Sequence, residues 1–325
     1  MKEQISQSEL LDRFGYYKTA ILGGEEIDIY LEDLDFGKEL TSNILHLPMK
    51  DSGKMDNYKI FIGGGEKFFA DYQKDKRELL VVGDGNLISE ELEFILYTYS
   101  EVSRNERGRF TFHAAAVAKE NRGLLILGDK GVGKTSLALS LCRDFGYSLI
   151  GNDVLVLGRT GDGAGIFDGD GVFRLRRLSV DKYFGELAGF LKDSQASGYD
   201  HKVSLKPMEL AVDLQKTPVE IDSAIQVFLN ADEKAPLELG VPPQLQLKLN
   251  LMENASRYIR ATATPLLGGE NFEYKGGLPS FNNPDLFQTR AGVLEELMQE
   301  IGVVSVSGGN LREIARYANE YHVSR

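Results

Sequence analysis

The stretch ILGDKGVGKTSLAL, residues 126–139, decides how this sequence is expected to fold. In it an apolar run ends at a glycine-rich turn, and an apolar pattern of helical period begins after a Lys-Thr pair. Gly128, Gly133, Lys134 and Thr135 match the pattern G-x-x-x-x-G-K-[ST] without a gap. The stretch therefore predicts a strand, a phosphate-binding loop (P-loop) and a helix in direct succession.

Each position of this pattern has a physical reason. Glycines let the backbone turn tightly enough to aim several N–H groups at one anion, and the N-terminus of the helix adds its positive end. The Lys134 ammonium reaches the β- and γ-phosphates of a nucleotide, and the Thr135 hydroxyl is a ligand for Mg²⁺. We therefore expect ATP and Mg²⁺ as cofactors. The predicted nucleotide-binding residues are Gly128, Asp129, Lys130, Gly131, Val132, Gly133, Lys134, Thr135 and Ser136.

The overall composition is that of a globular protein with an excess of acidic residues. The chain has 325 residues, of which 42% are hydrophobic and 26% charged, and its formal net charge is −12. Because nucleic-acid binding needs clustered positive charge, no nucleic-acid partner is expected. The single cysteine, Cys142, favours a reducing compartment and predicts a cytoplasmic protein. No apolar run is long enough to cross a bilayer, so no membrane partner is expected.

The charged segment SRNERGR, residues 103–109, marks the predicted boundary between two regions. Residues 1–105 are expected to form a smaller N-terminal α+β region, because short apolar segments alternate with glycine turns there. Residues 106–325 are expected to form the domain that carries the phosphate loop. The predicted elements of the first region are strands at 58–65 and 78–85 and a helix at 88–102, whose apolar residues repeat at helical spacing.

The second region is predicted to be α/β, with a mixed sheet that carries the loop and helices packed around it. Residues 110–118 and 123–128 are expected to pair as an antiparallel hairpin through the KENR turn between them. A helix is expected over 135–145, with Gly146 as its stop. The further predicted elements are strands at 148–158, 224–230 and 303–307, a turn-rich segment at 159–171, and helices at 285–301 and 309–321.

Two polar residues interrupt apolar strands near the loop. Asp153, in LIGNDVLVL, is the expected carboxylate for Mg²⁺ and for the acceptor proton, with a turn aspartate capped by backbone N–H groups as the alternative. His113, in FTFHAAAV, is an expected active-site residue, with a satisfied core histidine as the alternative. The predicted catalytic residues are thus Asp153, His113 and Lys134, and the predicted metal ligands are Thr135 and Asp153.

Taken together, these three segments resemble the core of the HPr kinase/phosphorylase family, which shares a phosphate-loop fold with the ATP-dependent phosphoenolpyruvate carboxykinases. The resemblance is carried by His113, GDKGVGKT at 128–135 and LIGNDVLVL at 149–157, and it extends over about residues 110–230. It implies a kinase-type catalytic domain in which His113 lies near the phosphates. It also implies that Asp153 is the metal-linked or basic carboxylate.

The sequence departs from this family at two points. Asn152 stands where the family has the first Asp of a pair, and asparagine accepts a metal contact but does not take up a proton as a base. FRLRRL, residues 173–178, stands roughly where the family has Glu-x-Arg-Gly, which puts HPr itself in doubt as the substrate. Cations for the transition state must then come from other residues. The candidates are Arg174, Arg176, Arg177, Lys202, Arg257 and Arg260.

The expected function is transfer of the ATP γ-phosphate to a hydroxyl. The acceptor is a serine of a protein or peptide, or a small hydroxylated molecule. Two rivals stay open: a nucleotide-hydrolysing switch that acts through a partner protein, and a binding protein that keeps ATP without turning it over. The sequence leaves homo-oligomerisation open as well.

Overall fold

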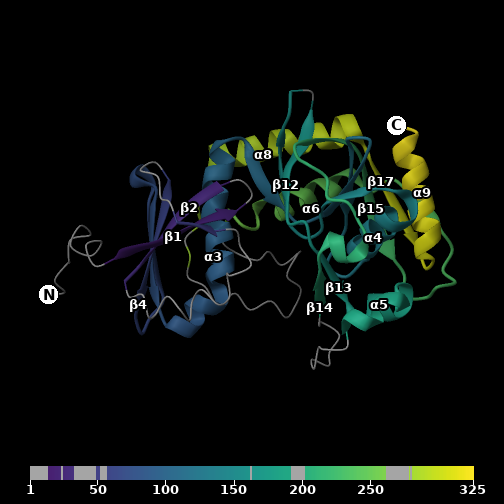
Figure 1. Ribbon diagram of the computed structural model, residues 1–325. Coiled ribbons are helices and arrows are strands. Elements are labelled where there is room, and N and C mark those ends of the chain that lie inside the picture. The colour runs from purple at the N-terminus through teal and green to yellow at the C-terminus, as the bar shows by residue number, and fades with distance from the viewer. Residues whose placement is uncertain are drawn as a thin grey trace. The chain divides into compact units, whose positions relative to one another are not determined.

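The computed structural model describes most of the chain as two compact units (Figure 1). Each unit is described by itself below. The first unit holds the described residues of 1–107 and 256–287, and the second holds those of 108–255 and 288–325. The described residues are 14–22, 25–32, 49–51, 57–161, 163–191, 202–260, 278 and 280–325.

The chain returns to the first unit after it has entered the second. The division between 105 and 106 expected from the sequence lies close to the crossing at Arg107–Gly108. The return at Ser256 has no counterpart in that expectation. Ile259 and Phe281 are buried in the hydrophobic core of the first unit, and this long-range packing leaves no mark in the local sequence pattern.

The first unit combines a mixed sheet with one long helix, α3 (Gly85–Glu106). The strand order is β3-β1-β2-β4-β6-β5, and β4 is parallel to both β2 and β6. Leu92, Ile95, Leu96 and Tyr99 of α3 are buried, as their helical spacing predicts. The strands are β1 (Gly15–Leu22), β2 (Glu25–Leu31), β3 (Met49–Lys50), β4 (Tyr58–Gly64), β5 (Phe69–Gln73) and β6 (Glu78–Gly83), with a 3₁₀ turn at Lys74–Lys76.

The described part of the second unit is built on a nine-stranded mixed sheet. Its main path runs β10-β8-β9-β15-β12-β11-β7, and β17 pairs with β15 and β16. β15 is parallel to β9 and β17, whereas the other pairs are antiparallel. Its strands are β7 (Arg109–Phe112), β8 (Ala115–Lys119), β9 (Arg122–Leu127), β10 (Ser148–Gly151), β11 (Leu155–Arg159), β12 (Ala164–Gly169), β15 (Val219–Leu229), β16 (Glu238–Gly240) and β17 (Val303–Gly308); β13 (Phe173–Arg176) and β14 (Lys202–Leu205) form a separate pair.

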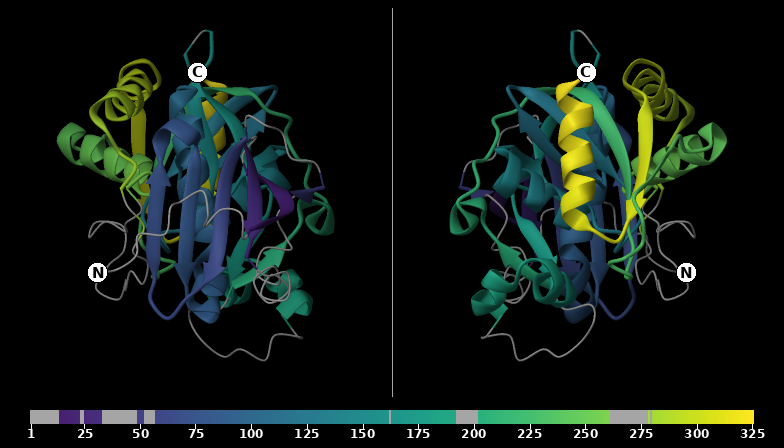
Figure 2. Two further views of the ribbon diagram at one scale, coloured as in Figure 1. Left: turned by 90° about the vertical axis from the view of Figure 1, so that its left-hand side faces the viewer. Right: turned by 90° about the vertical axis from the view of Figure 1, so that its right-hand side faces the viewer.

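Helices cover both faces of this sheet (Figure 2). One core joins α4 and α9 to the face that carries Ile225, and a second core joins α6 and α8 to the face that carries Ala224. None of the described helices is long and apolar enough to cross a membrane. The helices are α4 (Lys134–Phe145), α5 (Arg177–Tyr183), α6 (Gln244–Ser256), α8 (Pro284–Glu296) and α9 (Leu311–Val323), with 3₁₀ turns at Gly185–Leu191 and Pro207–Leu210 and a π turn at Leu297–Ile301.

Several local predictions are confirmed, and the α/β class with a mixed sheet and flanking helices is one of them. β8 and β9 form the expected hairpin, with Lys119 opposite Arg122. Both turn residues, Glu120 and Asn121, adopt the left-handed conformation that matches the twist of a two-residue hairpin. Helix α4 ends at Phe145 because Gly146 follows in a left-handed conformation and caps it.

Two strands that the sequence predicted as continuous are each broken in the middle. Residues 110–118 form β7 and β8 with a joint at His113–Ala114, and residues 148–158 form β10 and β11 with a joint at 152–154. The prediction was wrong because both halves of each run are buried, so the apolar pattern continues across the break. Tertiary pairing separates them: β8 and β10 pair with each other, whereas β7 pairs with β11.

The segment 159–171, predicted as turn-rich, contains strand β12. Its glycines and aspartates did not prevent strand pairing, because β11 and β15 lie on either side of it. Gly165 would place a Cβ 2.3 Å from Thr160 Cγ2, so the absence of a side chain permits the close return of the hairpin. The composition of this segment therefore does not indicate the strand that it contains.

The C-terminal turn of α9 carries a buried histidine, His322. Its Nδ1 lies 2.6 Å from the Ser223 hydroxyl oxygen and 3.7 Å from the Asp222 carboxylate. Burial lowers the pKa of His322, although Asp222 acts in the opposite direction. The folded protein therefore holds this imidazole neutral at a pH where an unfolded chain would begin to protonate it.

This depressed pKa predicts a loss of stability in mild acid. Below the ordinary histidine pKa of about 6.5, the unfolded chain gains a proton that the folded chain resists, so the free energy of unfolding falls by up to about 1.4 kcal/mol per pH unit. Melting temperatures between pH 7.5 and 5 should fall more steeply for the parent than for His322→Gln. Parallel pH profiles for the two proteins would contradict this assignment.

Candidate functional site

The carboxyl edge of the parallel strands gathers the residues that the sequence singled out. β9 and β15 are parallel, so the loop after Leu127 and the end of β15 at Leu229 lie at one edge. β8 runs antiparallel to β9, with Ala115 opposite Ile126, so His113 precedes β8 at this same edge. β10 pairs antiparallel with β8, which brings its last residue, Gly151, to the same edge. Ligands commonly bind at such carboxyl ends in open α/β sheets.

The loop between β9 and α4, here called the glycine-rich loop (residues 128–133), depends on left-handed glycines. Gly128, Gly131 and Gly133 have φ values of +143°, +90° and +104°. A Cβ on Gly133 would lie 2.7 Å from Cβ of Leu229, and one on Gly128 would lie 2.6 Å from Cγ2 of Val132. Both the backbone conformation and the close packing therefore require glycine at these two positions.

The loop is attached to the sheet and encloses its own lysine. The Leu229 N–H donates to the Val132 carbonyl oxygen at 2.8 Å. The Lys134 ammonium, on a residue only 6% exposed, donates to the carbonyl oxygens of Gly128 and Asp129, each at 2.9 Å. A buried ammonium needs such acceptors, and phosphate oxygens at this place would offer stronger ones.

The other predicted loop residues differ in exposure. Asp129, Lys130 and Gly131 are exposed at the apex of the loop, whereas Val132, Gly133 and Thr135 are half-buried. Ser136 is buried at the start of α4, so a contact from it to a bound anion would come from its backbone. Lys134 and Thr135 form the first turn of α4, where backbone N–H groups are left without helical partners.

A buried aspartate, Asp170, organises the joint that follows β10. Its Oδ1 accepts from the backbone N–H of Asn152 at 2.7 Å and, at 3.4 Å, from that of Asp153. The close approach depends on two glycines, because a Cβ on Gly151 would lie 2.8 Å from Cα of Gly169. Asp170 therefore fixes the direction in which the chain leaves β10.

Arg174 joins this aspartate to the predicted catalytic carboxylate. Its Nη1 donates to Asp170 Oδ2 at 2.6 Å and lies 3.6 Å from Asp153 Oδ2. Burial raises the pKa of Asp170 to about 6, while the Asn152 N–H and the Arg174 charge act in the opposite direction. Two carboxylates thus share one guanidinium, and Asp153 is the more exposed of the two, at 15% against 6%.

Asn152 is fully buried beside these charges, at 0% exposure. Neither atom of its side-chain amide has a hydrogen-bond partner among the described residues. A carboxylate at this position would add like-charge repulsion to the nearby carboxylates of Asp153 and Asp170. The neutral amide therefore suits the position electrostatically.

His113 is held through its main chain by α6. The Asn254 side chain accepts from the His113 N–H at 2.7 Å, and its amide nitrogen donates to the His113 carbonyl oxygen at 2.8 Å. Asn254 thereby supplies both hydrogen bonds that a neighbouring strand would otherwise give. His113 is half-buried, and it lies at the same edge of the sheet as the loop.

The residues present fit Mg²⁺ in the way that phosphoryl-transfer sites commonly hold it. No group of three or more His, Cys, Asp and Glu side chains gathers among the described residues. Such sites, however, need only one or two protein ligands, because substrate phosphates and water complete the octahedron. The Thr135 hydroxyl and the Asp153 carboxylate supply oxygen donors of that kind.

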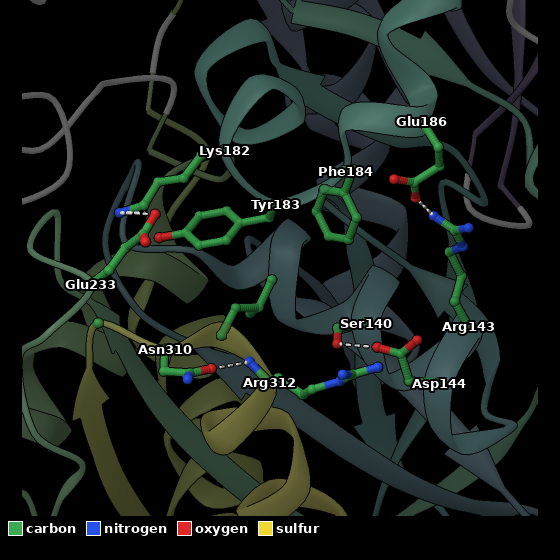
Figure 3. A pocket seen from close by; sticks show the side chains of 12 residues that line it. Ser140, Arg143, Asp144, Lys182, Tyr183, Phe184, Glu186, Glu233, Asn310 and Arg312 are labelled. Carbon is green, nitrogen blue, oxygen red and sulfur yellow. Dashed lines mark hydrogen bonds and ion pairs between the residues drawn. The ribbon is translucent and has the colours of Figure 1, made fainter.

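A polar pocket of about 420 Å³ lies alongside the far half of α4 (Figure 3). Its walls also come from the end of α5, the segment after β15 and the start of α9. Lys182 pairs with Glu233, and Arg143 pairs with Glu186. Figure 3 shows the Arg312 side chain pointing across the pocket floor toward Ser140 and Asp144. Most of the pocket's charges are therefore already compensated within the protein.

Comparisons with known proteins add no identification. A scan against protein-family models and a search of curated proteins find no match to this chain.

Sequence reasoning did not predict the contacts by which Asp170 and Asn254 position the candidate residues. Asp170 lies in a Gly/Asp-rich segment and Asn254 lies in an amphipathic helix, and neither is marked by a motif. Among the candidate cations, Arg174 and Arg176 lie near the loop and the carboxylates, whereas Arg177 is exposed and pairs with Asp181. Arg257 and Arg260 belong to the first unit, and the side chain of Lys202 lies outside the described residues.

The geometry of Gly133 leads to a test of the loop. Gly133→Ala should destabilise the protein by about 1–3 kcal/mol, because the new Cβ combines a left-handed φ with a clash at Leu229. It should also weaken ATP binding. The matched control is Gly292→Ala, which lies within helix α8 with its nearest neighbour at 3.7 Å and should be neutral or slightly stabilising. Equal melting temperatures and ATP affinities for the two variants would contradict the assignment.

Proposed function

We propose that this protein binds Mg-ATP at the glycine-rich loop and transfers the γ-phosphate to a hydroxyl acceptor. The observation that carries the proposal is the loop itself. It combines left-handed glycines, an enclosed lysine and the N-terminus of α4 at the carboxyl edge of a parallel strand. Backbone N–H groups, a helix N-terminus and an ammonium in one place form a cradle for a polyphosphate.

The proposed assignment of roles follows from where the charges lie. On ATP binding, the Lys134 ammonium exchanges the two loop carbonyls for oxygens of the β- and γ-phosphates. Thr135 and Asp153 would hold Mg²⁺, which would supply positive charge to neutralise the phosphates. His113 lies at the same edge, and we assign it the role of a proton carrier or hydrogen-bond donor at the phosphates.

The transfer step needs one acceptor, one leaving group and one proton acceptor. The acceptor oxygen bonds to the γ-phosphorus while the bond from that phosphorus to the β–γ bridging oxygen breaks. ADP leaves with the electron pair, and the hydroxyl proton passes to the Asp153 carboxylate. Asp170 and Arg174 orient Asp153 by fixing its backbone N–H and its side chain. We assign the acceptor to the class of serine-bearing peptides or proteins and small alcohols.

We also propose that the second unit is a member of the phosphate-loop folds related to HPr kinase/phosphorylase. The match in residues 110–230 and the order strand, loop, helix, strand, Asp153 support this. The acidic net charge and the single cysteine favour a cytoplasmic enzyme that does not bind nucleic acid.

The central test incubates the protein with Mg²⁺, γ-labelled ATP and a pool of serine peptides and hydroxylated metabolites. Label on an acceptor supports the proposal. Label that appears only as inorganic phosphate would favour the hydrolysing switch instead. Tight ATP binding without loss of the γ-phosphate would favour the non-catalytic protein.

Lys134→Ala should abolish transfer and weaken ATP binding, because the loop loses the ammonium enclosed by its own carbonyls. Lys248→Ala is the matched control, since this lysine lies on the exposed face of α6 in a pair with Glu295. ATP affinity is measured by calorimetry and turnover by label transfer. Parental values for Lys134→Ala would show that the loop is not a phosphate site.

Asp153→Asn should lower the transfer rate by about 10²–10⁴-fold with a much smaller effect on ATP affinity. The substitution keeps the size of the side chain but removes the proton-accepting oxygen and the charge toward Mg²⁺. Asp181→Asn, which removes an exposed ion-pair carboxylate from α5, is the control. If Asp153→Asn turned over at the parental rate, Asp170 would become the carboxylate to examine.

A further inference from the structure

The strand β13 directs an arginine at the apex of the glycine-rich loop. A Cβ built on Gly131 would lie 3.3 Å from Nη1 of Arg176, 3.8 Å from its Cζ and 3.9 Å from its Nη2. The whole end of the guanidinium therefore lies against the position where any other residue would carry a side chain. The absence of a side chain at Gly131, which is exposed and has a φ of +90°, leaves this space open.

Arg176 is placed by residues that hold β13 rigidly. Phe173 and Leu175 are fully buried in the core shared with α4, so one face of the strand is fixed. Side chains alternate along a strand, so Arg174 and Arg176 project from the opposite face. Arg174 is held by Asp170 at 2.6 Å, and Arg176 is the last strand residue before α5 begins at Arg177. The arginine is thus preorganised on a strand rather than carried by a loop.

We infer that Arg176 is the catalytic arginine of this protein, supplied in cis to the γ-phosphate, so that no partner protein has to insert one. This inference rests on the proposed function. During transfer, negative charge spreads over the equatorial oxygens of the γ-phosphoryl group and the β–γ bridging oxygen. Arg176 donates N–H groups to these oxygens and transfers no proton itself, since a guanidinium keeps its charge in proteins.

This assignment distinguishes the proposed kinase from the rival function, a nucleotide-hydrolysing switch that acts through a partner protein. A switch that depends on an activating partner lacks a cis arginine and turns over slowly alone, whereas an arginine in place accelerates phosphoryl transfer by about 10³–10⁵-fold. Arg177, the next residue, offers an internal comparison. It is exposed, and its Nε lies 3.5 Å from Asp181 on its own helix.

The experiment uses the full chain with the same pool of serine peptides and hydroxylated metabolites but with no activating partner protein. It compares the parent with Arg176→Ala, Arg176→Lys and Arg177→Ala. Three quantities are measured: the Kd for Mg-ATP, the rate of γ-phosphate loss, and the affinity for ADP with aluminium fluoride and Mg²⁺ as a mimic of the transferring phosphoryl group. Melting temperatures report whether each variant folds. If Arg176→Ala does not fold, Arg176→Lys takes its place in the test, because lysine keeps the positive charge but lacks the planar guanidinium.

The expected result is a fall of about 1,000-fold in the rate and the loss of tight aluminium fluoride binding in Arg176→Ala. Its ATP affinity should change by less than about tenfold, and Arg177→Ala should match the parent within about fivefold in every measurement. A parent that binds no Mg-ATP would overturn the proposed function. A parent that binds Mg-ATP but loses no γ-phosphate in the presence of the acceptor pool would likewise overturn the proposed function. A parent that turns over without a partner and keeps its rate in both Arg176 variants would overturn this inference alone.

Discussion

The hydrogen bond from the Leu229 N–H to the Val132 carbonyl is the contact on which the candidate site depends. It joins the glycine-rich loop to the end of β15, which is the strand that runs parallel to both β9 and β17. A loop of left-handed glycines has high conformational entropy when it is not held, so a fixed anchor is needed to keep its N–H groups converged. The contact at Leu229 supplies that anchor, and it leaves room for glycine alone at position 133.

The carboxylates beside the loop show a second constraint, which is the balance of buried charge. Asp153 and Asp170 share Arg174, and the adjacent Asn152 is neutral and fully buried. Two carboxylates gather at the place where we propose that a metal binds, and Arg174 supplies positive charge to both. A metal cation there would add positive charge beside these carboxylates, whereas a third carboxylate would add like-charge repulsion. The departure from an Asp pair at residue 152 is thus consistent with the local charges.

The predictions made from sequence succeeded where structure is local. The hairpin at Lys119–Arg122, the cap at Gly146 and the buried stripe of α3 each depend on residues within a few positions of one another. They failed where one continuous apolar run contains two strands that pair with different neighbours. The runs 110–118 and 148–158 each contain two buried strands, and nothing in hydrophobic periodicity marks the residue at which a strand changes neighbours.

By itself the sequence determined the loop, because its glycines, Lys134 and Thr135 are contiguous and the backbone conformations they require are intrinsic to those residues. It also indicated His113 and Asp153 as polar interruptions of apolar segments. The tertiary structure alone decided which distant residues hold them: Asn254 at His113, Asp170 and Arg174 at Asp153, and Arg176 at Gly131. These partners are between 17 and 141 positions away in the sequence. Contacts over such distances depend on how the strands pair and in which register, which no local sequence pattern encodes.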